Sequence, residues 1–317
     1  MKKYTEMLPY IENGDYDYHF WNAMRGKTES LDRMGHGRSS ATGTYAMAPI
    51  SNNKYMKALA KESLFRNIGT VVNAFNSGYR ILAKDCKDVV AWVLENGEVP
   101  MADPMDDFTQ LSVDSHKLAV FLKTDEDFVR DATFDFEAYL THRLAKNFGR
   151  AEDKAFITGT GEGMPTGILC PGKGAEVGLT TDKITYEDIV KLFLSVNVEY
   201  RRNGAWLMND ETAIFLRTLK DSGGNYIWNH ANDTLLGKRV ITSEYMPTIE
   251  SGSMPILFGD YSFYWVIGRS PVSVRPITEM FVTLNQIGHL AFEFLDGKLI
   301  RREAVKGIKI TDTAPAE

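Results

Sequence analysis

The chain has 317 residues, of which 44% are hydrophobic and 25% are charged, close to the average of soluble globular proteins. Its formal net charge of -6 argues against a protein that grips nucleic acid through a general basic surface, because such binding needs clustered lysine and arginine. The sequence has neither the roughly 20 apolar residues of a membrane helix nor a signal peptide, so we expect a cytoplasmic protein without membrane contact.

The first 45 residues are polar, punctuated by glycine and without a sustained hydrophobic period, apart from a short amphipathic piece over 20–26. The segment 34–44 has too few apolar residues to become ordered through burial. We therefore predict an extended N-terminal arm that needs the surface of a partner.

The next part of the chain is predicted to form a short helix over 54–65 and a strand-rich stretch over 70–82. Two long strands follow in the prediction, over 88–94 and 111–123. The acidic segment 95–107 between them contains two prolines. We therefore expect a β-hairpin that projects from the body of the protein.

A long helix is predicted between residues 125 and 158. Its apolar positions recur at spacings of three and four, at Phe136, Leu140, Leu144, Phe148, Ala151 and Ala155, while Glu152 is placed with the charged residues on other faces. Such a helix of about 24 residues would be about 36 Å long. It would serve as a strut.

A glycine-rich run follows this helix, with Gly159, Gly161, Gly163 and Gly167. It resembles a nucleotide-binding loop, but a phosphate-binding loop follows a strand and opens a helix, and the Gly-Lys-Ser/Thr ending is absent. We therefore interpret the run as a helix C-terminal turn that uses glycines for positive φ. Mutation of these glycines is expected to damage assembly and not turnover.

The remainder of the chain mixes helices and strands. Thr185 and Asp188 resemble a capping box that opens a helix through Tyr200. A helix is also predicted from Asn209 or Asp210 to the glycines at 223–224, and strands are predicted at 205–208, 238–243, 255–258, 264–267 and within 280–310. Without a regular alternation of strand and helix, this pattern indicates the α+β class.

Residues that could carry catalysis or bind a metal form no local motif. The six histidines are scattered, and Cys86 and Cys170 are far apart and are interpreted as reduced, partly buried thiols. The acidic cluster of Asp103, Asp106 and Asp107 lacks the spacing of a calcium loop. We predict no catalytic, cofactor-binding or metal-binding residue and no cofactor, although a site could still assemble from distant residues.

The order of the predicted elements resembles the major capsid proteins of tailed bacteriophages with the Hong Kong 97 fold. The segments that carry the resemblance are 152–161, 165–169, 206–216, 219–221, 224–228 and 235–240, within residues 45–310. The resemblance implies an N-terminal arm (1–45), the start of a peripheral domain (46–87), an extended β-hairpin loop (88–124), a spine helix with more of the peripheral domain (125–184), an axial domain (185–271) and peripheral return strands with the C-terminus (272–317).

The resemblance also implies a function. The chain would be a major head protein without catalytic activity, assembling with itself into pentamers and hexamers of an icosahedral shell around phage double-stranded DNA, bound without sequence specificity. Its implied partners are scaffolding, portal and protease or decoration proteins, and its place is the virion capsid, assembled in the bacterial host cytoplasm. Because only about 45 residues precede the match, either scaffolding is a separate protein or the shell assembles on the short arm.

Two alternative functions remain at this stage. One is the shell of an encapsulin-like nanocompartment, which shares the fold and encloses protein cargo. The other is an α+β enzyme with a site assembled across the axial domain, which the absence of a catalytic motif disfavours.

Overall fold

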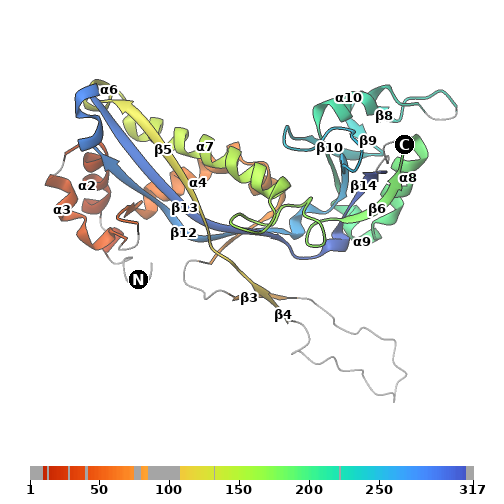
Figure 1. Ribbon diagram of the computed structural model, residues 1–317, viewed down its shortest axis with the longest axis horizontal. Helices are drawn as coiled ribbons and strands as arrows, with labels where there is room; N and C mark the ends of the chain where they lie inside the picture. Colours follow the sequence, from red (N-terminus) through yellow and green to blue (C-terminus); the bar gives the residue numbers. More distant parts are fainter. Residues whose placement is uncertain are drawn as a thin grey trace, which may run out of the picture.

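The computed structural model describes residues 10–12, 14–27, 29–39, 42–74, 80–84, 108–131, 133–220 and 223–311. Within these residues the molecule is elongated, with two lobes connected by long strands (Figure 1). A small two-stranded sheet stands apart from both lobes (Figure 1). The mixture of helices and sheets confirms the α+β prediction.

The first lobe is built on a five-stranded sheet. Its strands are β1 (Tyr45–Ala46), β12 (Tyr264–Ile277), β13 (Gln286–Leu299) and β5 (His116–Asp125) in that order, with β2 (Thr70–Asn73) beside β12. The long neighbours β12, β13 and β5 are antiparallel, whereas β2 runs parallel to β12. The helical segments of this lobe are α2 (Gly14–Met24), α3 (Glu29–Arg33), η1 (Gly35–Gly37), α4 (Pro49–Glu62), α5 (Phe65–Ile68), α6 (Glu126–Arg130), α7 (Phe136–Thr158) and η4 (Glu279–Leu284).

The predicted long helix is confirmed as α7, which has 23 residues. It begins where the side chain of Asp135 accepts a hydrogen bond of 3.0 Å from the amide of Ala138, which satisfies one of the free amides of the first turn. Its apolar face joins α4 and the sheet in one core, which includes Leu140, Leu144 and Phe148. Burial of this face and the cap explain why the strut forms.

The second lobe contains a seven-stranded sheet with a core of its own. The strand order is β6 (Glu176–Thr181), β14 (Val305–Ile310), β11 (Ile256–Gly259), β7 (Ala205–Met208), β10 (Lys238–Thr242), β9 (Thr234–Leu235) and β8 (Trp228–Asn229). The helical segments are α8 (Tyr186–Ser195), α9 (Val198–Arg202), α10 (Asp210–Thr218), η3 (Tyr261–Phe263) and η5 (Arg302–Ala304). Strand β14 lies in this sheet, whereas β12 and β13, the long strands that precede it, belong to the sheet of the first lobe.

Most of the helix starts and ends predicted for the second lobe can be compared directly with the structure. Thr185 and Asp188 form the predicted capping box, with the Thr185 amide donating to the Asp188 carboxylate at 3.0 Å. The helix does not continue to Tyr200 as predicted, because Asn197 caps a separate helix, α9. Helix α10 begins after Asn209 but ends at Thr218, before the glycines that were expected to stop it.

The described start of the chain differs from the predicted extended arm. Helices α2 and α3 lie against the end of the first lobe (Figure 1), and Phe20 and Met24 are completely buried there. The Tyr16 hydroxyl donates to the carbonyl of Ala46 at 2.7 Å. The arm prediction was wrong for these residues because Tyr16, Phe20 and Met24 recur every four residues and form a short apolar stripe, which the prediction did not use.

The small sheet consists of β3 (Arg80–Lys84) and β4 (Phe108–Ser112), which pair in antiparallel fashion. The predicted strand 88–94 and acidic segment 95–107 lie outside the described residues. The predicted single strand over 111–123 was wrong, since the chain leaves β4 at Ser112 and begins β5 at His116, which belongs to the sheet of the first lobe.

Candidate functional site at the lobe junction

A buried ionic cluster lies where α5, α7 and β13 meet. The guanidinium of Arg66 donates two hydrogen bonds to the carboxylate of Glu152, at 2.6 and 2.7 Å, and a third of 3.0 Å to Glu293. The side chains of all three residues are at most 5% exposed. A forked guanidinium suits this arrangement because it can satisfy one carboxylate in bidentate fashion and still reach another.

The second oxygen of Glu293 accepts a hydrogen bond of 2.8 Å from the hydroxyl of Tyr55. Burial, followed by the nearby negative charge of Glu152, raises the pKa of Glu293 to about 7. A buried carboxyl group with a raised pKa beside a second carboxyl group is a pattern found in acid–base catalysis. Here, however, Arg66 and Tyr55 occupy the carboxylate oxygens, so the cluster connects the four elements α4, α5, α7 and β13 and leaves little capacity for a substrate.

The neighbouring carboxylate, Asp153, holds the segment that leads into α5. It accepts hydrogen bonds from the amides of Leu64 (2.8 Å) and Phe65 (3.2 Å) and from the hydroxyl of Ser63 (2.8 Å). Burial raises the pKa of Asp153, against these hydrogen bonds. Glu152 and Asp153 therefore attach the C-terminal half of α7 to α5 and to the residues that lead into it.

The glycine-rich turn closes the C-terminal end of α7. The amides of Ile168 and Leu169 donate to the carbonyls of Phe156 (2.7 Å) and Ile157 (3.0 Å), and that of Gly167 donates to Gly159 (2.9 Å). The returning chain thus caps carbonyls that a helix end leaves free. These three amides are consequently not available to a phosphate group.

The individual glycines serve different purposes. Gly161 and Gly163 have positive φ, as the sequence predicted, whereas Gly159 has a φ of -62°. A Cβ at Gly159 would meet the carbonyl oxygen of Pro165, and one at Gly167 would lie 2.5 Å from the amide nitrogen of Gly159. The predicted turn is confirmed, and close backbone approach explains Gly159 and Gly167.

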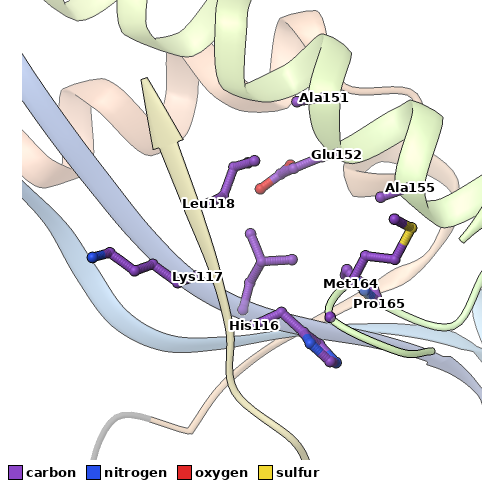
Figure 2. Close-up of a pocket in the computed structure, with 10 residues that line it drawn as sticks. His116, Lys117, Leu118, Ala151, Glu152, Ala155, Met164 and Pro165 are labelled. Atoms are coloured by element: carbon purple, nitrogen blue, oxygen red, sulfur yellow. The ribbon is translucent and has the colours of Figure 1, made fainter. Parts of the chain in front are cut away.

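A cavity of about 70 Å³ lies between α7, the glycine-rich turn and the start of β5. Figure 2 shows Glu152 and His116 on opposite sides of it, with Met164 and Pro165 from the turn. This volume holds a few water molecules and is too small for a substrate, since ligand sites usually exceed about 300 Å³.

Other chemistry-bearing residues are dispersed. No group of histidine, cysteine, aspartate and glutamate in the described ranges could hold a metal ion. Cys170 is buried, with its sulfur 3.5 Å from the carbonyl oxygen of Thr160. Cys86 and the acidic cluster at 103–107 lie outside the described residues. Among the helices that are described, none is both long and apolar enough to cross a membrane.

Sequence reasoning missed the ionic cluster and placed Glu152 on an outer face of its helix, which was wrong. Glu152 lies four residues after Phe148 and four before Phe156, in phase with the apolar stripe. Glu293 similarly shares a face of β13 with Ala291 and Leu295. The sequence signal for the buried cluster was therefore a charged residue at a position where the helix or strand period requires an apolar one.

The comparisons with known proteins agree on one family. Residues 43–310 match the sequence model of the phage capsid family. The capsid of an empty GTA particle with C5 symmetry has a TM-score of 0.65 and 27% identity, covering 79% of this chain and 90% of that one. The native GTA particle gives 0.60 and 27%, covering 78% and 89%.

A more distant structure, from Gordonia phage Cozz, has a TM-score of 0.52 and 12% identity, covering 80% of this chain and 87% of that one. At this identity the likeness concerns the fold alone. No curated protein matches the sequence.

Proposed function

Since this chain belongs to the phage capsid family and is a major capsid protein of the Hong Kong 97 fold, we propose that its copies form pentamers and hexamers that close into an icosahedral shell around double-stranded DNA. The shell needs no catalysis by this chain. The net charge of -6 is compatible with a lining that encloses DNA without binding it tightly.

One observation carries the proposal at the level of this molecule. The β3–β4 pair stands away from both lobes (Figure 1) and contains only two strands among the described residues. An isolated two-stranded sheet is marginally stable in water. A surface on a neighbouring copy would supply the missing burial, as expected for a subunit whose stable state is an assembly.

The proposed domains of the capsid subunit correspond to the two lobes and the hairpin. We assign the peripheral domain to the first lobe, the spine helix to α7, the extended loop to the β3–β4 hairpin and the axial domain to the second lobe. The further proposed partners are scaffolding, portal and protease or decoration proteins, and assembly is proposed to take place in the bacterial host cytoplasm.

The test is to produce the chain alone and examine the soluble fraction by negative-stain electron microscopy. We expect rings of five and six subunits or shells of uniform curvature. A matched control replaces residues 80–112 with a short glycine-serine linker, which should leave a folded monomer by circular dichroism and light scattering. A parent chain that stays monomeric at high concentration, with and without the other head proteins, would contradict the proposal.

A further inference from the structure

The hairpin is joined to the first lobe at a compact root. The chain departs after Ala74, at the end of β2, and returns through Val113, between β4 and β5. Ala74 and Val113 are both buried and share a small apolar cluster with Ile267 of β12. We call these residues, with Ser112 and Asp114, the hairpin root.

Two side chains of β13 hold the returning strand of the root. The carboxylate of Asp296, which is completely buried, accepts a hydrogen bond of 2.9 Å from the amide of Asp114. The ammonium of Lys298 donates to the carbonyl of Ser112 at 2.8 Å and to the carboxylate of Asp114 at 3.0 Å. Both groups thus hold Ser112 and Asp114, where the chain turns from the hairpin into the sheet.

Asp296 is itself fixed in place. It accepts from the amide of Gly297 at 2.8 Å, lies 3.3 Å from the Lys298 ammonium and has the His116 imidazole 3.6 Å away. Lys298 is 18% exposed at its side chain, so water screens this pair only in part. The contacts at the returning strand are therefore charge-assisted, the stronger class of hydrogen bond.

The departing strand is held by β12. The amide of Ala74 donates to the carbonyl of Gly268 at 2.8 Å, and the guanidinium of Arg269 donates to the carbonyl of Ala74 at 3.2 Å. Both strands of the hairpin are consequently attached to β12 and β13 by side chains that reach the backbone of the root.

Stability alone does not explain a charged pair at this place, since burying charges is costly and well-packed apolar residues in place of a whole buried ion pair often cost little. A buried ionic group is instead suited to fixing one geometry. The chain between β4 and β5 has no strand pairing of its own at residues 113–115. The direction of the hairpin therefore depends on the root contacts.

We propose that Asp296 and Lys298 are positioning residues that set the angle at which the hairpin leaves the sheet, so that it meets a second copy of this chain in a single register. The partner's identity rests on the proposed function, whereas the clamp on the root is a property of the isolated chain. The two parts can therefore be tested separately.

The first measurement is hydrogen exchange of the unassembled chain, in the parent, Asp296→Asn and Lys298→Met. We expect the Asp114 amide to exchange at least about tenfold faster in Lys298→Met, because this variant loses both hydrogen bonds that Lys298 donates to the root and the cation beside Asp296, which is the acceptor of the Asp114 amide. The control is Lys306→Met, because Lys306 is 22% exposed and pairs with Glu176 at 3.7 Å in the second lobe. It should leave exchange at the root unchanged.

The second measurement is the yield of closed particles of uniform diameter by electron microscopy. Lys298→Met should fold with parental circular dichroism yet give mostly irregular or open particles, Lys298→Arg should recover closed ones, and Lys306→Met should match the parent. If Asp296→Asn fails to fold, the comparison of Lys298→Met with Lys298→Arg tests the positioning role.

The outcomes separate the two hypotheses. Uniform shells from Lys298→Met at parental yield, or unchanged exchange at Asp114, would overturn the positioning role. A parent chain that never assembles would instead defeat the proposed function. In that case the exchange experiment still decides whether Lys298 clamps the root.

Discussion

The two lobes differ in the kinds of side chain that they bury. The first lobe encloses ionisable residues, namely Arg66, Glu152, Asp153, His289, Glu293 and Asp296. The core of the second lobe is aromatic and aliphatic, built around Trp206 and Phe258 with ring centroids 4.5 Å apart. Its buried Asp188 serves as a helix cap.

The difference follows from the lengths of the elements. The first lobe contains a helix of 23 residues and two strands of 14, whose repeating apolar faces could pack in more than one register. Charged groups that must meet one partner favour a single alignment. The second lobe has shorter elements whose shapes specify their packing, so apolar contacts suffice.

The largest expected effect comes from removing the central cation of the first lobe. In Arg66→Met, Glu152 and Glu293 would remain buried without their partner, and we expect the free energy of unfolding to fall by about 3–5 kcal/mol. Urea denaturation followed by circular dichroism measures this. The control Arg217→Met breaks an exposed ion pair with Asp233 and should cost less than about 1 kcal/mol. An equal loss of unfolding free energy in Arg66→Met and Arg217→Met would contradict a special role of the buried ionic cluster.

A somewhat smaller effect is expected from truncating the apolar core of the second lobe. Leu216 on α10 is completely buried, and Leu216→Ala should lower the free energy of unfolding by about 2–4 kcal/mol. On the same helix, Ile214 is 63% exposed, and Ile214→Ala should stay within about 0.5 kcal/mol. This loss of unfolding free energy in Leu216→Ala should be independent of pH. A loss that varied between pH 5 and 7 would contradict the view that the core of the second lobe is stabilised by apolar contacts.

The pH dependence of the first lobe provides a third test. The pKa of Glu293 is raised from 4.5 to about 7, so between these values the folded chain binds more protons than the unfolded chain. This contribution to stability is therefore complete below pH 4.5 and is lost as the pH rises through 7. Glu293→Gln should flatten that part of the curve, by at most about 1.4 kcal/mol per pH unit for one proton. Thermal unfolding of both proteins across pH 4.5–7.5 measures this. If Glu293→Gln and the parent showed the same slope of stability against pH, the raised pKa of Glu293 would be contradicted.

The smallest expected effect lies at the N-terminal helix. Nε2 of His289 is 2.9 Å from the carbonyl oxygen of Met24, and burial lowers the pKa of His289 to about 4. The unfolded chain then binds more protons between pH 4 and 6.5, so this contribution is lost as the pH falls through that window, opposite to Glu293.

His289→Gln, which retains a donor for Met24, should remove this acid sensitivity, whereas the exposed His142→Gln should not. Hydrogen exchange of α2 at pH 4.5 and 6.5 distinguishes the variants. Equal acid sensitivity in His289→Gln and the parent would contradict the assignment.

How far the sequence predicted the structure depended on the distance between interacting residues. The cap formed by Thr185 and Asp188 and the strand 205–208 were predicted correctly because their signals are local. Arg66 lies 86 residues from Glu152 and 227 from Glu293, so no periodicity could pair them. The packing of α2 also involves a residue outside its own segment, since Tyr16 finds its partner 30 residues away.

The hairpin root has a consequence for the order of events during synthesis. Asp114 is held by Asp296, which follows it by 182 residues, so the ribosome must deliver most of the described chain before the root can form. Contacts with such large sequence separation form late because a long loop must close first. A partly made chain therefore lacks a fixed docking direction. Premature association with finished neighbours is disfavoured until β13 has been translated.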